Sequence, residues 1–414
     1  MKAYKYSGHK WIGNIPVDWD MIRLGSVYVQ RNNKVNTNDF PPLSITMEGV
    51  VPQLDYVAKS NDETNRKQVL KGDFVINSRS DRRGSCGVSP MDGSCSVINI
   101  VLTSRDKTDV RFFDYALQSK CFPDEFYRWG SGIVADLWST RWDAMSKIEL
   151  PYPSFEERCK IADFLDSHCK EIDEIITDTS NSIEELKKLK KAYTINVITY
   201  GLDRNVDKKE SGIVWIPTIP ASWEVKKIKR VIFPVCKNVL DTDDIITCFR
   251  DGEVTLRKNR RADGYTISYT ENGYQGVDQG DLVIHGMDAF AGAIGCSDSR
   301  GKITPVVHVC STAGNNRYFM YALRNMAYSD VLMDFSNGIR VRSSDYRNFA
   351  KLGIFEIPVP PVEEQNKIAD YLDEKSELID GLIKDKENYL IELKEYKKLL
   401  IYEYVTGKKE VPQS

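Results

Sequence analysis

The sequence predicts an α+β protein built as an internal repeat, in which two similar globular domains are each followed by a long helix. The first observation is a Trp-Ile-x3-Pro-x2-Trp stretch at 11–19 that returns at 215–223. The second is that 156–166 returns, nearly unchanged, at 363–373. The third is the heptad spacing of apolar residues behind each copy. Two copies in one order indicate a pseudo-twofold arrangement folded from a single chain.

The first domain is expected at 1–153 and the second at 204–360. Short β-rich runs such as 73–76 are separated by Gly, Pro, Asn and Asp, which favours strands joined by turns. A helix is expected near 111–119 and a last strand follows shortly before the domain ends. The second copy keeps this order, since the Gly-Asp-aliphatic strand returns at 280–284. This mixture predicts an α+β domain in each copy.

Each domain ends in Pro-x-Pro, and helical character begins directly behind it. We expect one spacer helix at 154–203, a second at 361–407, and a short tail at 408–414. Polar interruptions make either helix unstable alone, so the two should pair antiparallel as a coiled coil. The apolar heptad positions are the expected inter-helix seam: Ile161, Leu165, Ile172, Ile175, Leu186, Leu189, Ile368, Leu372, Ile379, Leu382, Leu393 and Leu400.

Composition is that of an ordinary soluble protein, with 41% hydrophobic and 28% charged residues. Neither a membrane span nor a secretory leader is indicated, because no apolar run is long enough. The nine cysteines are scattered singly, which favours reduced thiols in the cytoplasm. A net charge of −3 argues against a protein that binds nucleic acid by overall positive charge. Any DNA affinity should therefore come from local patches and from partners.

No catalytic constellation can be assembled from the sequence. The four histidines (His9, His168, His285 and His308) lack metal-ligand spacing, and no phosphate-binding Gly-x4-Gly-Lys-Ser/Thr loop is present. The glycine-rich turn and Asn/Asp-Pro-Pro-aromatic tetrapeptide of an amino-methyltransferase are missing as well. We expect no catalytic residue, no metal site and no cofactor bound by this chain.

The candidates for DNA contact lie in loops where the two copies differ. The loop at 77–84 concentrates arginines with amide and hydroxyl groups, which can read bases or hold phosphates. A second pair of segments is 130–142 and 336–348, and a basic patch at 257–261 is more typical of phosphate binding. The expected DNA-binding residues are Asn77, Ser78, Arg79, Arg82, Arg83, Ser131, Trp138, Arg141, His285, Asp288, Asn337, Arg340, Arg342 and Arg347.

Each of these segments has a structural alternative. The loop at 77–84 could be an ordinary solvated turn, and Trp138 and Trp142 could belong to the core. Trp11, Trp19, Trp215 and Trp223 recur together with their prolines, so they are interpreted as scaffold rather than contact residues.

On these residues, the chain resembles the specificity subunit of type I restriction–modification systems. The resemblance is carried by the Trp-Ile-x3-Pro-x2-Trp motifs, the Gly-Asp-aliphatic strands and, above all, the closing motifs at 150–165 and 357–372. The closing motif occurs twice with a long helix behind each copy, and the similarity covers nearly the whole chain. Arg158 stands where the second copy has Gln365, a difference without an expected functional cost at a helix start.

The resemblance implies two target-recognition domains, each reading one half of an asymmetric, interrupted double-stranded DNA target. It implies that the helices set the gap and dock two modification subunits, which bring S-adenosylmethionine and methylate adenine. Restriction subunits would add ATP- and Mg-dependent translocation and cleavage. The chain itself would be non-catalytic.

Two alternatives remain at this point. The chain could be an enzyme, a nuclease or methyltransferase whose site escapes notice, or a stand-alone DNA-binding or scaffold protein without restriction–modification partners. Methylation or cleavage by the chain alone would favour the first. Tight specific binding by the chain alone would favour the second.

Overall fold

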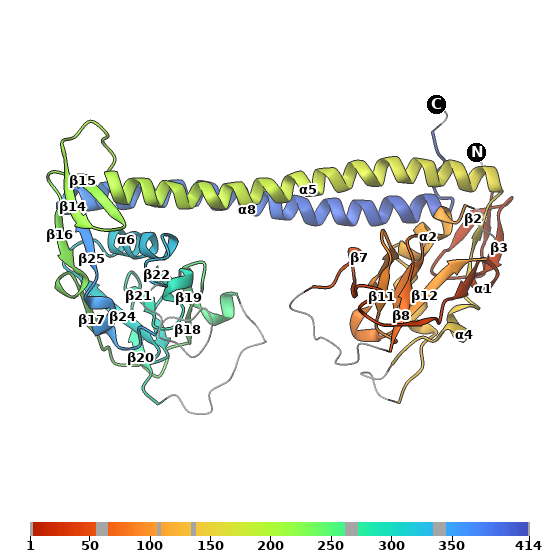
Figure 1. Cartoon of the computed structure of the whole chain (residues 1–414), viewed down its shortest axis with the longest axis horizontal. Coiled ribbons are helices and arrows are strands. Elements are labelled where there is room, and N and C mark those ends of the chain that lie inside the picture. The colour runs from red at the N-terminus through yellow and green to blue at the C-terminus, as the bar shows by residue number, and fades with distance from the viewer. Residues whose placement is uncertain are drawn as a thin grey trace. The chain divides into compact units, whose positions relative to one another are not determined.

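The computed structural model describes residues 3–54, 65–105, 109–133, 138–260, 272–333 and 345–412 of the chain (Figure 1). It divides into two compact units. Unit 1 consists of Met1–Ser180 with Glu387–Ser414, and unit 2 is Asn181–Lys386. Each unit therefore holds one globular domain and parts of both long helices, α5 (Phe155–Tyr200) and α8 (Val362–Val405). The predicted domain boundaries stay predictions.

Unit 1 is organised around a four-stranded antiparallel sheet of order β10-β9-β12-β4. Smaller sheets are β11-β8-β5, β1-β2, β13-β3 and β6-β7. The strands are β1 (Tyr4–Tyr6), β2 (Asn14–Pro16), β3 (Asp20–Arg23), β4 (Tyr28–Gln30), β5 (Lys34–Val35), β6 (Leu43–Thr46), β7 (Gly49–Pro52), β8 (Arg66–Val69), β9 (Phe74–Asn77), β10 (Cys86–Val88), β11 (Gly93–Cys95), β12 (Asn99–Ser104) and β13 (Glu149–Tyr152).

The short helices of unit 1 are α1 (Leu24–Val27), η1 (Ser80–Arg82), α2 (Arg111–Gln118), α3 (Phe122–Arg128) and α4 (Trp142–Met145). Strand β9 is apolar at consecutive positions because both of its faces are covered, so Phe74, Val75 and Ile76 are all buried. Helix α2 packs Phe112 and Leu117 into the same core as Phe74 and Ile76. The helix and the central strand are thus joined through one core.

Unit 2 has a four-stranded antiparallel sheet of order β17-β24-β21-β22 and the two-stranded sheets β14-β15, β16-β25, β18-β19 and β20-β23. Its strands are β14 (Lys208–Ile213), β15 (Ile216–Pro220), β16 (Glu224–Lys227), β17 (Ile232–Val235), β18 (Ile246–Cys248), β19 (Val254–Leu256), β20 (Gln275–Val277), β21 (Leu282–His285), β22 (Ile294–Cys296), β23 (Gly301–Ile303), β24 (Val307–Thr312) and β25 (Glu356–Val359). Its short helices are η3 (Ile228–Arg230), η4 (Arg257–Asn259), η5 (Ala289–Ala291), α6 (Asn316–Tyr328) and α7 (Phe349–Gly353).

The two main sheets share strand order and register. In unit 1, Val75 of β9 lies opposite Val101 of β12. In unit 2, Val283 of β21 lies opposite Val309 of β24. The repeated tryptophans Trp19 and Trp223 are buried in their cores, at 1% and 0% exposed. Positions in the two units can therefore be equated strand by strand.

The long helices run antiparallel within each unit. In unit 1, Lys397 Nζ of α8 lies 2.6 Å from Asp173 Oδ1 of α5, and the rings of Phe164 and Tyr404 are 4.4 Å apart. In unit 2, Lys190 Nζ of α5 lies 2.6 Å from Asp380 Oδ2 of α8. Within the described residues, no helix is long and apolar enough to cross a membrane.

Eight of the twelve predicted seam residues are buried, one is half-buried and three are exposed. Ile161, Leu165 and Ile172 join the core of unit 1, as do Leu400 and its neighbours. Ile368, Leu372, Ile379 and Leu393 are buried as well, while Leu186 is half-buried. Ile175, Leu189 and Leu382 are 41%, 44% and 44% exposed, so their assignment to the seam is corrected. Two paired helices bury only a narrow stripe, and Ile183 is buried there instead.

Candidate nucleic-acid interface

In unit 1, two of the predicted contact segments lie side by side. The backbone N–H of Thr140 donates to the carbonyl of Ser78 at 3.0 Å, and the N–H of Ser80 donates to the carbonyl of Trp138 at 3.2 Å. Arg79 forms an antiparallel bridge with Ser139. The loop after β9 and the segment before α4 therefore form one surface, although they are distant in the sequence.

The loop after β9 is shaped by its own polar side chains. Asn77 Oδ1 accepts a hydrogen bond from the N–H of Arg79 at 3.0 Å, which is the geometry of an Asx turn. Ser78 Oγ donates to the carbonyl of Ile98 at 2.6 Å. Asn77 and Ser78 thus hold the loop, and the side chain of Arg79 projects from it as an exposed group.

The other arginines of this surface differ in their surroundings. Arg82 is 58% exposed, with Nε 3.8 Å from Asp81 Oδ2. Arg83 Nη2 lies 2.8 Å from Asp124 Oδ1, and its guanidinium stands 4.4 Å from the centre of the Tyr127 ring. Arg141 is exposed at the start of α4. Arg83 is therefore tethered by an ion pair and a cation–π contact, whereas Arg79, Arg82 and Arg141 point outward from the surface.

Trp138 and Ser131 mainly organise the second segment. The indole Nε1 of Trp138 donates to the carbonyl of Tyr127 at 3.0 Å, and the two rings are 5.7 Å apart. A Cβ at Gly130 would lie 2.3 Å from that nitrogen, so a glycine is required for the close approach. Ser131 is exposed and exchanges backbone hydrogen bonds with Ser139. Trp138 is half-buried, so its exposure does not decide between a DNA-contact residue and a core residue.

Unit 2 brings its equivalent segments together with the same bond. The N–H of Tyr346 donates to the carbonyl of Gly286 at 2.7 Å, as Thr140 does to Ser78 in unit 1. Tyr346 is buried, its carbonyl contacts His308 Nε2 at 2.7 Å, and its hydroxyl donates to the carbonyl of Leu332. A Cβ at Gly286 would lie 2.7 Å from the carbonyl oxygen of Val306. The frame is the same, and the side chains on it are different.

On the surface of unit 2, His285 accepts a backbone hydrogen bond, and two aspartates form ion pairs with arginines. Nδ1 of His285 accepts from the N–H of Asp288 at 3.1 Å, and burial lowers the pKa of His285, which favours the neutral imidazole. Asp288 pairs with Arg250 at 2.9 Å, and Arg347 pairs with Asp345 at 2.9 Å. The predicted contacts Asn337, Arg340 and Arg342 lie outside the described residues.

Arg250 is a further candidate for DNA contact that no sequence pattern marks. It lies on the turn before β19, and the buried Arg324 of α6 holds this turn by donating from Nη2 to the carbonyl of Gly252 at 2.6 Å. Arg324 also donates from Nε to the carbonyl of Ile294 at 2.7 Å. The unit 1 residue at the Arg324 position is Gln118, so comparison of the copies could have marked Arg324 as different, but not its partners.

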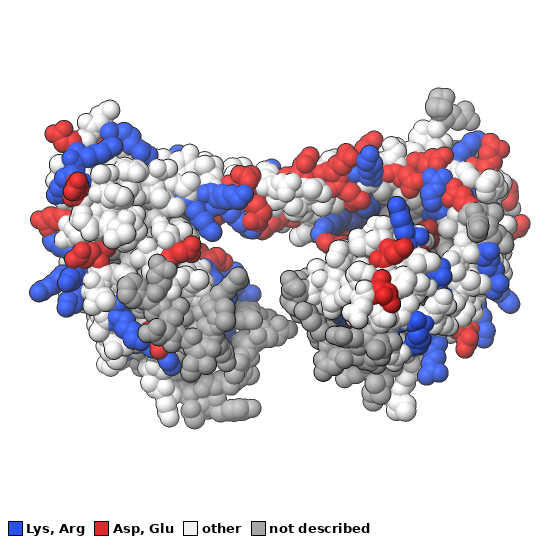
Figure 2. Space-filling model, in the orientation of Figure 1, with Lys and Arg blue, Asp and Glu red and all other residues white. Residues whose placement is uncertain are grey.

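Cations on both surfaces pair with carboxylates of their own unit, as Arg83 does with Asp124 in unit 1. Unit 2 pairs several cations with carboxylates of its own, including Arg260 with Asp251 and Lys258 with Asp244. Figure 2 shows that acidic side chains gather along the helical part of unit 1 rather than over the whole unit. A polyanion is therefore expected to meet the loops and not the helices.

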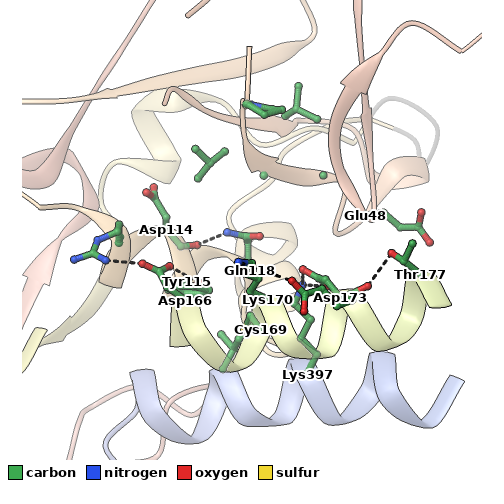
Figure 3. A pocket seen from close by; sticks show the side chains of 18 of the residues that line it. Glu48, Asp114, Tyr115, Gln118, Asp166, Cys169, Lys170, Asp173, Thr177 and Lys397 are labelled. Atoms are coloured by element: carbon green, nitrogen blue, oxygen red, sulfur yellow. Dashed lines mark hydrogen bonds and ion pairs between the residues drawn. The ribbon is translucent and has the colours of Figure 1, made fainter. Parts of the chain in front are cut away.

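A cleft of about 970 Å³ in unit 1 lies between the domain and the helices (Figure 3). Its wall contains Asp166 and Asp173, but Asp166 accepts from Tyr115 and Asp173 pairs with Lys397. Among the described residues, no group of three His, Cys, Asp or Glu is placed to hold a metal ion. Asp166 and Asp173 are thus engaged in binding one part of unit 1 to another.

Comparisons with known proteins point to one family, although no family model matches the chain. A protein of Methanocaldococcus jannaschii named as the MjaX specificity subunit of a type I restriction enzyme is 22% identical over 96% of this chain and 95% of its own length. The MjaVIII specificity subunit of the same organism is 24% identical over 56% of this chain and 54% of its own length. The chain is thus similar over nearly its whole length to a protein named as a type I restriction specificity subunit.

A solved structure supports the fold of this family. A chain from a study of "complex assembly and conformational transition of the type I R-M system" matches with a TM-score of 0.63. The match is 15% identical and covers 95% of this chain and 99% of that chain. At this identity the likeness concerns the fold, which is a mixture of helices and strands in both proteins.

Proposed function

We propose that the chain is the DNA-specificity subunit of a type I restriction–modification complex. Each globular domain would be a target-recognition domain that reads one half of an asymmetric, bipartite double-stranded DNA target. The observation that carries this proposal is the shared loop frame. The Thr140–Ser78 and Tyr346–Gly286 bonds are equivalent, while the exposed side chains around them differ. Two different half-sites need such a common scaffold with different readers.

The helices are proposed to act as the spacer. The pairs Lys397–Asp173 and Lys190–Asp380 occupy equivalent positions of the repeat, which supports an antiparallel coiled coil with pseudo-twofold symmetry. Such a pair would set the gap between the half-sites and dock the modification subunits. A stand-alone binding or scaffold role is not favoured, because the similarity to specificity subunits extends over 96% of the chain.

The chemistry is assigned to partner subunits. Two adenine methyltransferase subunits would bring S-adenosylmethionine, and restriction subunits would bring ATP and Mg for translocation and cleavage. This chain would bind no cofactor and catalyse no reaction, and the complex would act in the cytoplasm. Partner subunits would also supply positive charge that a chain of net charge −3 lacks.

Within the DNA surface, Arg79, Arg82 and Arg141 are proposed to contact bases or phosphates in unit 1. Arginine matches guanine bidentately and also pairs with phosphate, so residue type alone does not separate the two roles. In unit 2, Nδ1 of the neutral His285 already accepts from a backbone N–H, so its Nε2–H is left as a donor. The carboxylate of Asp288 offers an acceptor, and an acidic side chain accepts from the amino group of cytosine.

Binding measured with and without partners tests the proposal. The chain co-purified with its cognate modification subunit should bind one bipartite sequence far more tightly than unrelated DNA, and the chain alone should bind weakly. Sub-micromolar specific binding by the chain alone would favour the stand-alone alternative. Methylation or cleavage by the chain alone would favour an enzyme.

A further inference from the structure

An ion-pair cluster joins the domain of unit 1 to helix α5. Arg111, the first residue of α2, places Nη1 2.5 Å from Asp166 Oδ2 and 2.9 Å from Asp163 Oδ1. One helical turn later, Tyr115 donates from its hydroxyl to Asp166 Oδ1 at 2.7 Å. Figure 3 shows Tyr115 and Asp166 next to each other at the wall of the cleft. Both oxygens of Asp166 are therefore used by α2.

Unit 2 repeats these contacts with equivalent residues. Arg111 additionally pairs with Asp109 at 2.5 Å, where unit 2 has Asn315. Arg317 of α6 places Nη1 2.5 Å from Asp373 Oδ2 and Nη2 2.7 Å from Asp370 Oδ1 of α8. Tyr321 donates from its hydroxyl to Asp373 Oδ1 at 2.7 Å. We call each cluster of one arginine, one tyrosine and two aspartates a clamp. The clamps account for the repeated Ala-Asp-x-Leu-Asp sequence, which the DNA-reading loops do not explain.

The spacing of these residues fixes the orientation of the domain helix relative to the long helix, as well as the contact between them. Arginine and tyrosine lie four residues apart on one helix, and the aspartates lie three residues apart on the other, so each pair shares a helix face. Between the aspartates of unit 1, Leu165 is buried, and the preceding Ala162 is fully buried. Two points of contact along each helix resist rotation of one helix against the other, which a single ion pair does not.

Each clamp is connected to a reading loop through a packed core. In unit 1, Phe112 and Leu117 of α2 share a core with Phe74 and Ile76 of β9, whose end begins the loop at 77–84. In unit 2, Tyr318 and Leu323 of α6 share a core with Leu282 and Ile284 of β21. Close-packed cores transmit a displacement instead of absorbing it.

We propose that the two clamps set the angle at which each recognition domain is held on its helix, and thereby the gap length at which both half-sites can be methylated. Asp166 and Asp373, with their arginine and tyrosine partners, are positioning residues that do not touch DNA. This inference rests on the proposed function. Because Arg111 and Arg317 are 40% and 42% exposed, the clamps should matter more for geometry than for overall stability.

The test uses the full complex with the modification subunit and DNA in which the two half-sites are separated by gaps varied in single base pairs. The variants are Asp166→Asn and Asp373→Asn, with Tyr115→Phe and Tyr321→Phe as milder forms that each remove one hydrogen bond. Glu171→Gln, an exposed carboxylate of α5, is the matched control.

We expect each clamp variant to keep both half-site sequences and to raise the ratio of methylation at neighbouring gaps to that at the preferred gap. The expected rise is about two- to fivefold, the effect of losing a partly exposed ion pair. The control should keep the parent gap profile.

An equal loss at all gaps would overturn the proposal, since it marks a purely stabilising role, and so would an unchanged profile in the clamp variants. If Asp166→Asn or Asp373→Asn fails to fold, the tyrosine variants decide between these outcomes. Failure of the unmodified complex to methylate any bipartite target would instead refute the proposed function, and the clamps would then have no gap length to set.

Discussion

A buried carboxyl group in unit 1 should make the stability of that unit depend on pH. Asp114 of α2 is 7% exposed and accepts a hydrogen bond from Tyr28 Oη at 2.6 Å. Burial raises the pKa of Asp114 to about 7, the bond from Tyr28 lowers it, and the charges of Asp109 and Asp166 raise it. The carboxyl group is therefore protonated in the folded state at pH values where it is ionised in the unfolded chain.

The direction and the size of the pH effect on the free energy of unfolding follow from this difference in protonation. The folded state holds the proton to a higher pH than the unfolded state, so the free energy of unfolding falls as pH rises from about 4 to about 7 and then levels off. A shift of about three units from the ordinary value corresponds to a total loss of about 4 kcal/mol. In Asp114→Asn this dependence should disappear, because the amide does not titrate in this range.

Unit 2 provides the matched comparison. The residues at the positions of Tyr28 and Asp114 are Ile232 and Met320, both buried and neither titratable. The double variant Tyr28→Ile/Asp114→Met should likewise lose the pH dependence. Tyr28→Phe should destabilise unit 1, since the buried carboxyl group loses its donor.

The assay is hydrogen exchange of α2 peptides at pH 5.5 and pH 8, corrected for the intrinsic exchange rates, with α6 peptides as the internal control. In the parent protein, α2 should lose more protection than α6 on going to pH 8. Equal changes in α2 and α6, or a pH dependence of α2 that persists in Asp114→Asn, would show that the Asp114 carboxyl group is not the cause.

Three further results are expected. Arg79→Ala or Arg82→Ala should weaken binding of the complex by about 1–3 kcal/mol at one position of one half-site if the arginine reads a base, and a loss that is the same for all sequences marks a phosphate contact instead. Lys397→Asp and Asp173→Lys should each destabilise the helix pair by about 0.2–1 kcal/mol in thermal unfolding, with partial recovery in the double variant; no recovery would contradict the pairing. Exchange of residues 1–153 for the equivalent domain of a relative should change one half of the methylated target, and a change in both halves would contradict a modular reader.

Periodic features could be predicted from the sequence. Pro-x-Pro followed by acidic residues and heptads predicted the long helices, and α5 and α8 begin at Phe155 and Val362. The run at 73–76 corresponds to β9, because consecutive apolar residues suit a strand covered on both faces. The heptad pattern failed at Ile175, Leu189 and Leu382, since apolar spacing does not state how wide a stripe two helices bury.

The candidate surface was predicted as segments but not as an arrangement. The loops were found because the copies diverge there, yet the bond from Thr140 to Ser78 joins residues far apart in sequence. The clamps were not predicted for the same reason. Asp166 belongs to a repeat that is visible in the sequence, but its partner Arg111 lies on another helix. The hydrogen bond from Arg324 to the carbonyl of Gly252 also joins residues far apart in sequence, so local sequence patterns do not predict it.

If this chain determines a two-part DNA sequence for a methyltransferase partner, the methylated sites in DNA should depend on it. The most direct measurement is to map methylated adenines in DNA from cells that co-express the chain with its cognate modification subunit. We expect methylation at one interrupted sequence with two different halves and a fixed gap, lost when the chain is omitted. Methylation that does not depend on the chain, or that follows an uninterrupted or symmetric sequence, would contradict this expectation.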